Sequence, residues 1–330
     1  MSTPHQISYE ELNAQHEAFD ACVAKTPEID QFCSSSAWAF SAYEAFSPDY
    51  ETFISKSDLG YVALAQSTHD RLGRFRQPLE ASWCLASPFV GPDPKGLMDQ
   101  FARACLVDKH TWDLLFLSGI EKDGVLYKNI IECFSGLFFV GVGPPVGRFV
   151  ANLEDGLDGF LSRRSSKFRA NLRRIDRRAS EQELTWTFLS SADEALDWER
   201  VYQRILDIEA RSWKGLSDTG IIDESMQTFY RYMMPRLNET GRLRVLFIHQ
   251  GEQDVAFVFG GVFNGGYRGL QLSFDADFAS SSAGNLAQYW MIQRLIEEGV
   301  SSYDLGSELE YKQNWAETRH ETTSLVIRGW

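Results

Sequence analysis

Cysteine is scarce in this chain, and the few cysteines support neither a disulfide framework nor a metal site. There are five in 330 residues, an odd number, and all lie in the first half of the sequence. Their spacing matches no zinc knuckle. The simplest interpretation is a set of reduced thiols in a cytoplasmic protein. The cysteines are Cys22, Cys33, Cys84, Cys105 and Cys133.

Long apolar runs are also missing. No run of about 18 apolar residues occurs, so we expect no membrane-spanning helix. The first residues read MSTPH and lack the basic and then apolar pattern of a secretory signal. These absences favour a cytoplasmic location, while no pattern in the sequence indicates an oligomeric state.

Several well-known catalytic motifs are absent. None of the six histidines forms a helix-spaced pair, and no cluster of cysteine and histidine suggests zinc. The sequence has no GxGxxG or Walker loop and no GxSxG elbow. Metal-dependent, nucleotide-hydrolysing and serine-hydrolase chemistry are therefore disfavoured, and we expect no metal cofactor.

Positive charge is in deficit, with a formal net charge of −14. A globally acidic protein is a poor general binder of nucleic acid. One segment is an exception: between positions 161 and 179 eight basic residues stand against the single acid Asp176, a net charge of +7 that leaves −21 for the rest. The basic residues are Arg163, Arg164, Lys167, Arg169, Arg173, Arg174, Arg177 and Arg178.

The apolar residues of this basic segment recur at helical spacing and predict a helix with one buried face. They are Leu161, Phe168, Leu172, Ile175 and Ala179. The arginines then occupy the other faces. Two interpretations stay open: a solvated cationic face that covers acidic neighbours, or a binding site for an anion, since the arginine fork binds two oxygens at once.

The length of the chain and its 44% hydrophobic residues predict two packed domains. The first 50 residues are typical of helices joined by loops. Strand-like runs follow at 61–65, 79–86, 112–117 and 136–143, with a helix at 97–106. The motif VGPPVG at 142–147 indicates a turn or linker. We therefore predict domains at 1–150 and 151–330.

The second half predicts a mixed α/β (α+β) domain. After a strand at 184–190, the spacing of Ser191 and Glu194 is that of a capping box, followed by a helix with an inward stripe at Trp198, Val201, Ile205 and Ile208. A second helix is predicted at 224–237, kinked or shortened by Pro235. The remaining predictions are three strands at 243–249, 254–263 and 267–275, a helix at 284–298, and strands at 302–305 and 323–328.

A run of small residues, 280–284 (SSSAG), lies between the third of these strands and the helix. Serines before a helix are ordinary N-caps, and this is the simpler interpretation. Small residues at a helix N-terminus also permit an anion to approach backbone N–H groups. The sequence alone leaves both interpretations open.

Four segments resemble the CelD/BioF2-like acetyltransferase domain of the GNAT superfamily, which is related to the Fem-type aminoacyl transferases. They are FLSRRSSKFRANLRRIDRR (160–178), EARSWKG (209–215), LSFDADFASSSAGNL (272–286) and YDLGSELEYKQNW (303–315). The segment HTWDLLFLSGI (110–120) resembles the N-terminal part of the same proteins. The order of predicted elements in the second half also matches the GNAT fold.

The resemblance implies tandem GNAT-like domains with mixed central sheets flanked by helices. The first would be a degenerate copy, and the second would hold the donor, acetyl-CoA or another acyl-CoA. The expected reaction is direct attack of an amine on the thioester. The expected acceptor is a small-molecule or glycan-linked amine. The basic segment would then bind the 3′-phosphate of coenzyme A, a tRNA acceptor stem or an acidic glycan.

The resemblance also implies which residues form the site. In this fold the strand before the crossover helix splays from its neighbour, and the loop before the helix binds the pyrophosphate. The donor-binding candidates are Leu272, Ser273, Phe274, Ser281, Ser282, Ala283, Gly284 and Asn285. Trp213, Lys214 and Tyr311 are candidates for binding the acceptor.

Three residues are candidates for catalysis. Asp275 and Glu209 could take the proton of the amine, although Asp275 could equally cap a loop and Glu209 could be a solvated helix carboxylate. Lys312 matches a lysine of the Fem-type motif that stabilises negative charge on the donor or the intermediate. Alternatively, its side chain could lie over Trp315 or Tyr311 at the surface. Trp213 could equally belong to the core.

This sequence departs from the usual GNAT loop, because no glutamine or arginine opens it and only one glycine closes it. Two alternatives to an acyl-CoA transferase therefore remain. One is a Fem-like transferase that uses aminoacyl-tRNA, favoured by the basic segment and disfavoured by the acidic remainder. The other is a binding module that keeps the fold without catalysis.

Overall fold

The computed structural model describes residues 4–217 and 220–329 and divides into two compact units. One unit is Met1–Gly147 with Glu321–Trp330, and the other is Arg148–His320. The domains predicted from the sequence were 1–150 and 151–330. That prediction assigned the last ten residues to the second domain, whereas they belong to the first unit. In the described part of the chain, no helix combines the length and apolarity that crossing a membrane requires.

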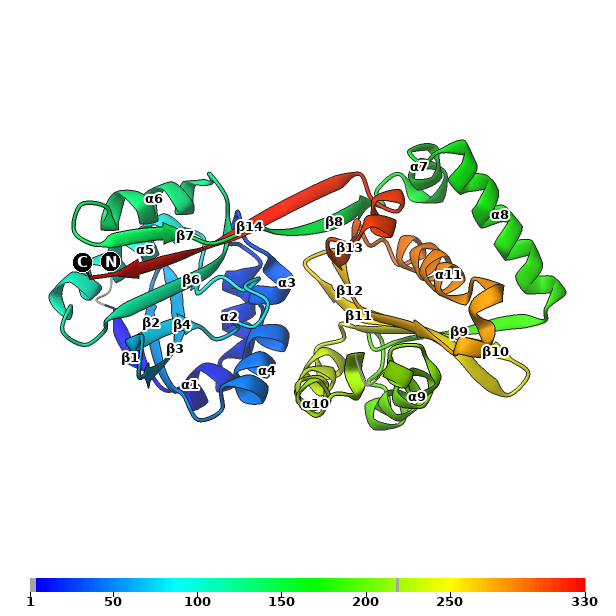
Figure 1. Ribbon diagram of the computed structural model, residues 1–330, viewed down its shortest axis with the longest axis horizontal. Helices are drawn as coiled ribbons and strands as arrows, with labels where there is room; N and C mark the ends of the chain where they lie inside the picture. The colour runs from blue at the N-terminus through cyan, green and yellow to red at the C-terminus, as the bar shows by residue number, and fades with distance from the viewer. Residues whose placement is uncertain (1–3, 218–219, 330) are drawn as a thin grey trace. The chain divides into compact units, whose positions relative to one another are not determined.

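The first unit is a mixed sheet with helices on both faces (Figure 1). Its strands follow the order β1-β2-β3-β4-β6-β14, with β5 beside β3 and β7 beside β14. The strands are β1 (His5–Ile7), β2 (Glu51–Ser57), β3 (Gly60–His69), β4 (Gly73–Pro78), β5 (Phe89–Val90), β6 (Leu114–Glu121), β7 (Phe139–Val142) and β14 (Thr318–Arg328). The helices are α1 (Tyr9–Ala14), α2 (His16–Val23), α3 (Gln31–Ser34), α4 (Ser36–Phe46), α5 (Pro94–Val107) and α6 (Val125–Phe134).

Strands β4 and β6 of this unit are parallel, and α5 is the crossover helix between them. Asp93 caps α5, its Oδ1 accepting a hydrogen bond from the Gly96 N–H at 2.9 Å. The carboxylate of Glu80 is buried and accepts hydrogen bonds from the N–H groups of Leu85 and Ala86 at 3.0 and 3.1 Å. The predicted strand at 79–86 is wrong, because these amides bind Glu80 instead of a neighbouring strand.

The second unit is a sheet in the order β8-β13-β12-β11-β10-β9. Its only parallel pair among the described strands is β12 with β13. The strands are β8 (Val146–Asn152), β9 (Leu184–Ser190), β10 (Leu243–Gln250), β11 (Gln253–Phe263), β12 (Gly266–Phe274) and β13 (Ser302–Ser307). The predicted order of the elements after residue 184 is therefore confirmed.

Helices cover both faces of this second sheet (Figure 1). Helix α11 packs on one face, with α8 against it, and α9 and α10 pack on the other face. The α helices are α7 (Gly156–Ser162), α8 (Ser166–Glu181), α9 (Trp198–Arg211), α10 (Glu224–Glu239) and α11 (Ala283–Glu297). The short 3-10 turns in the described residues are η1 (Gly215–Ser217), η2 (Gly220–Ile222), η3 (Ala276–Ser281) and η4 (Glu310–Asn314).

The starting point predicted for α9 is wrong. The helix begins at Trp198, and Asp197 is its N-cap, accepting a hydrogen bond from the Arg200 N–H at 3.2 Å. Ser191 instead accepts a hydrogen bond from the Leu243 N–H at 3.0 Å, so its hydroxyl serves strand β10 and not a helix. Pro235 lies inside α10, which continues to Glu239 and is not shortened.

The predicted basic helix is divided: Leu161 belongs to α7, and α8 begins at Ser166. Within α8, Leu172, Ile175 and Ala179 are buried as predicted. The first arginines of the basic segment precede α8 and have structural partners: Arg163 and Arg164 bind Glu317 Oε1 at 2.7 and 2.8 Å. Other cations of the segment are exposed to solvent. These exposed residues are Lys167, Arg173, Arg174 and Arg177.

Candidate active site

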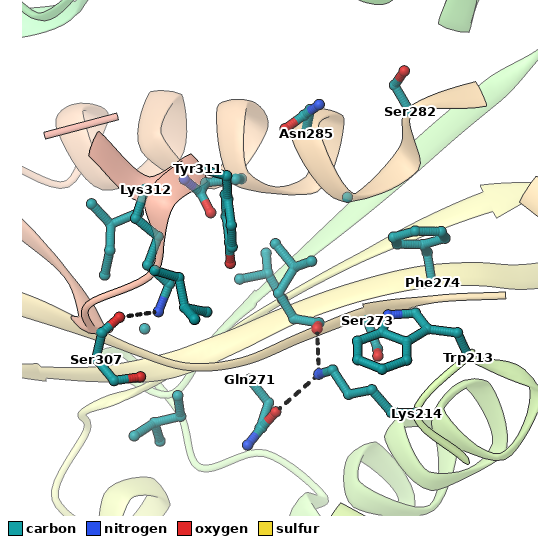
Figure 2. Close-up of a pocket in the computed structure, with 18 of the residues that line it drawn as sticks. Trp213, Lys214, Gln271, Ser273, Phe274, Ser282, Asn285, Ser307, Tyr311 and Lys312 are labelled. Atoms are coloured by element: carbon teal, nitrogen blue, oxygen red, sulfur yellow. Dashed lines mark hydrogen bonds between the residues drawn. The ribbon is translucent and has the colours of Figure 1, made fainter. Parts of the chain in front are cut away.

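A cleft opens in the second sheet where two neighbouring strands stop pairing. Strands β12 and β13 pair only from Gly266 with Ser302 to Arg268 with Asp304. Beyond these pairs the strands diverge, and a cavity of about 560 Å³ lies between them. The resemblance implied this splay. The cavity is lined by residues of β12, β13, α11, η4 and the loop after α9 (Figure 2).

The N-terminus of α11 forms one wall of the cavity. Ser282, the N-cap residue, has a left-handed backbone with φ of 60°, and its side chain makes no capping hydrogen bond. Ser282 therefore has the N-cap position that the simpler interpretation predicts, but its hydroxyl does not cap the helix. Because the first amides of a helix have no intrahelical acceptor, N–H groups of this turn can receive a ligand. Ser282, Gly284 and Asn285 line the cavity.

Two predicted members of this loop lie behind the wall. Ser281 is buried, and its hydroxyl donates to the Phe278 carbonyl at 2.6 Å. Ala283 is fully buried in the core. Neither residue is among those that line the cavity. They shape the turn rather than offer groups to a ligand.

Strand β12 presents different chemistry on its two faces. A Cβ on Gly284 would lie 3.2 Å from the Leu272 side chain and 3.1 Å from Phe274, so these two side chains face α11 and leave little room at that glycine. Ser273 points to the opposite face, as alternation along a strand requires (Figure 2). It is 2% exposed, and its Oγ has no hydrogen-bond partner among the described residues.

Lys214 comes from the loop after α9 and extends to β12 on the same face as Ser273 (Figure 2). Its Nζ donates to the Leu272 carbonyl at 2.9 Å and to Gln271 Oε1 at 3.3 Å. Burial lowers the pKa of Lys214, and the carboxylate of Glu209 acts in the opposite direction. Trp213, beside it, also lines the cavity and is 60% exposed, so it is not a core residue.

Glu209 is completely buried and does not line the cavity, so it is not a solvated helix carboxylate. Its Oε1 lies 3.9 Å from Lys214 Nζ, and its Oε2 accepts a hydrogen bond from Ser212 at 3.3 Å. In this position Glu209 holds Lys214. Its role as a base stays a prediction, because the carboxylate is not among the groups that line the cavity.

Lys312 and Tyr311 belong to η4 and form the wall opposite Lys214 (Figure 2). Lys312 Nζ donates to the Ser307 carbonyl at 2.9 Å. Burial lowers the pKa of Lys312 to about 8, and the positive charge of Arg268 contributes to this shift. An ammonium held by one carbonyl at the edge of a cavity can stabilise negative charge that develops there.

Asp275 lies outside the cavity. Its Oδ2 lies 2.7 Å from Arg211 Nε, and its Oδ1 caps η3 by accepting from the Asp277 N–H at 3.1 Å. The geometry is that of a loop cap, the alternative to the predicted role as a base.

Sequence reasoning missed several residues of the site. Gln288 lies one turn beyond Gly284 on α11, lines the cavity and has a buried Nε2 without a hydrogen-bond partner among the described residues. A polar residue in the otherwise apolar stretch LAQYWMI was the available signal. Gln271 and Ser307 also line the cavity, but neither carried a distinctive spacing.

Comparisons with known proteins place this arrangement in a known fold. Residues 166–313 match the family model described as "Acetyltransferase (GNAT) domain". That range contains the cavity and all the residues described above as lining it. No curated protein sequence matches the chain.

Solved structures of the same fold cover both units. A conserved protein of unknown function from Bacteroides thetaiotaomicron aligns over 99% of this chain and 100% of its own, with 15% identity and a TM-score of 0.66. FemX aligns over 98% and 97%, with 12% identity and a TM-score of 0.64. The C-terminal domain of a putative lysylphosphatidylglycerol synthetase from Agrobacterium fabrum aligns over 96% and 93%, with 14% identity and a TM-score of 0.58. At these identities the likeness shows the fold, a tandem arrangement of two α/β units with mixed sheets.

Proposed function

Since residues 166–313 match the family model of an acetyltransferase (GNAT) domain, we propose that this chain is an acyltransferase that moves an acyl group from acyl-CoA to an amine. The observation that supports the donor is the junction of a cleft and a helix N-terminus. The cleft between β12 and β13 ends at the first turn of α11, where N–H groups and the helix dipole favour a diphosphate.

The proposed reaction is a direct attack. The amine nitrogen bonds to the thioester carbonyl carbon, the carbon–sulfur bond breaks, and the amine loses a proton as the thiol leaves. Lys312 stabilises the negative charge that develops on the carbonyl oxygen or the sulfur. Lys214, Trp213 and Tyr311 surround the acceptor. Glu209 positions Lys214.

A second candidate donor is aminoacyl-tRNA. The exposed cations of α8, among them Arg173 and Arg174, offer phosphate-binding groups on the same unit. The FemX likeness covers the whole chain but shows only the fold. Titration calorimetry of the full chain with acetyl-CoA and, separately, with charged tRNA discriminates the two donors. Micromolar binding of acetyl-CoA and none of tRNA is the expected result.

Turnover is tested by the release of CoA thiol with a panel of amines. The expected result is thiol release that depends on the amine. Binding of acetyl-CoA without release over a broad panel would favour a module that keeps the fold but lacks catalysis. Binding of charged tRNA in preference to acetyl-CoA would contradict the acyl-CoA proposal.

Asp275→Asn should keep acyl transfer within about threefold of the wild type, because the carboxylate lies outside the cavity. The variant should lose about 1 kcal/mol of unfolding free energy, since the bond to Arg211 is partly solvated. Thiol release and urea unfolding measure the two effects. A loss of activity of about 100-fold with unchanged stability would instead identify Asp275 as the base.

A further inference from the structure

The cavity has an unusual distribution of charge for a site that binds an amine. Its described lining residues include two lysines, Lys214 and Lys312, and no aspartate or glutamate. The lysines lie on opposite walls, one from the loop after α9 and one from η4 (Figure 2). An ammonium that entered this cavity would therefore meet like charges on two sides and no carboxylate.

Several ion pairs lie behind the walls of the cavity. Glu209 offsets Lys214, at 3.9 Å. Arg268 binds Asp304 at 2.8 Å, and Arg148 bonds to the same carboxylate. The charges that line the cavity are thus those of the two lysines, and Glu209 lies 3.9 Å behind one of them. All of these groups are at least partly withdrawn from water, which strengthens their attraction for an anion.

Ser273 adds a hydrogen-bonding group that the protein leaves unused. Its hydroxyl is buried, lines the cavity and has no hydrogen-bond partner among the described residues. It lies on the face of β12 that Lys214 approaches, opposite the face of Leu272 and Phe274 (Figure 2). A buried hydroxyl without a partner costs free energy, which a bound acceptor oxygen would recover.

We infer that the acceptor is an amine that also carries an oxyanion, a carboxylate or a phosphate, and that Lys214 Nζ and Ser273 Oγ bind this oxyanion on the α9 side of β12. The inference rests on the proposed function and names its second substrate class. The oxyanion compensates the charge of the cavity, and it holds the amine beside β12, where the thioester is expected. A neutral or purely cationic amine has neither advantage.

A merely structural Lys214 would look different. If the lysine served only to neutralise Glu209, we would expect both side chains to be fully buried. Instead Glu209 is fully buried, whereas Lys214 keeps 21% of its side chain exposed and lines the cavity. The carboxylate thus fixes the direction of the lysine from behind.

The test compares three probes that share one amine and one chain length: β-alanine, 2-aminoethylphosphonate and β-alaninamide. Calorimetry on the full chain should show at least one of the two anionic probes binding about tenfold or more tighter than the amide. Preference for β-alanine indicates a carboxylate, and preference for the phosphonate indicates a phosphate. Equal affinity for all three probes, or no binding of any, would overturn the inference.

Two variants locate the effect. Ser273→Ala should lower the anion preference and leave the fold intact, because the hydroxyl has no partner to lose. Lys214→Met combined with Glu209→Gln should abolish the preference without leaving a buried carboxylate uncompensated. The exposed-lysine variant Lys109→Met is the control and should keep the preference in full. Retention of the preference in both site variants would contradict the assignment to Lys214 and Ser273.

Binding of CoA, measured in the same samples, separates this inference from the proposed function. If CoA binds and the three probes bind equally, the anionic acceptor is wrong while the donor proposal stands. If CoA does not bind but the anion preference persists and depends on Lys214, the oxyanion site stands and the acyl-CoA donor is wrong.

Discussion

Replacing Lys312 with methionine is expected to lower kcat/KM for acyl transfer about 100- to 1,000-fold, the range found when one group that stabilises an oxyanion is removed. The lysine lies on the cavity wall and its Nζ is held by the Ser307 carbonyl at 2.9 Å. Affinity for CoA should change by less than about threefold, because the diphosphate is expected at α11 and not at η4. Thiol release and calorimetry measure the two quantities.

The pH dependence of kcat/KM distinguishes whether Lys312 acts as a charged ammonium or as a neutral amine. Its pKa of about 8 means that the ammonium is present below pH 8 and is lost as the pH rises through that value. If the ammonium stabilises negative charge, kcat/KM, which reports the free enzyme and the free amine, should fall above about pH 8 relative to Lys312→Arg. Lys312→Arg should retain more activity than Lys312→Met and lose this fall. A rise of kcat/KM through pH 8 that is absent from Lys312→Arg would show that the neutral amine of Lys312 acts as a base, whereas a rise in both enzymes reports proton loss from the acceptor amine.

Asn285→Glu is expected to weaken CoA binding about 100-fold, because it places a carboxylate where the diphosphate is proposed to lie. Asn285 is exposed, lines the cavity and belongs to the first turn of α11. An acid in that turn favours the helix, so the unfolding temperature should stay unchanged or rise slightly. Affinity is measured by calorimetry and stability by thermal unfolding.

Asn285→Gln is the matched control, since glutamine has the size of glutamate without its charge. It should bind CoA within about threefold of the wild type. The difference between the two variants should shrink at high salt, because exposed charges are screened. Equal CoA affinities of the glutamate and glutamine variants would contradict the proposal that the diphosphate binds at the N-terminus of α11.

Periodicity sufficed for most elements of the second unit. The meander β10–β12 and helix α11 lie within two residues of their predicted limits, since each has a regular apolar pattern. Strand β8 was missed, because the sequence around it was interpreted as a linker after VGPP. Its status as a strand depends on pairing with β13, some 150 residues away in the chain, which no local pattern records.

The site was predicted in part for the same reason. Lys214 and Lys312 were singled out by resemblance, and both line the cavity. The surroundings of Asp275 and Glu209 cannot be read from sequence spacing. Asp275 is paired with Arg211, and Glu209 is completely buried. The face to which Ser273 points follows from strand alternation, but its lack of a partner is a tertiary property.

The first unit has the same strand–helix–strand crossover, β4–α5–β6, but supplies anions of its own. The carboxylate of Asp93 accepts a hydrogen bond from an N–H group in the first turn of α5. The carboxylate of Glu80 accepts hydrogen bonds from N–H groups of the segment that precedes this helix. A diphosphate approaching this helix would meet a like charge already in place. We expect each polypeptide to load a single acyl donor, so that turnovers follow one another at one cleft and do not alternate between two halves of a duplicated chain.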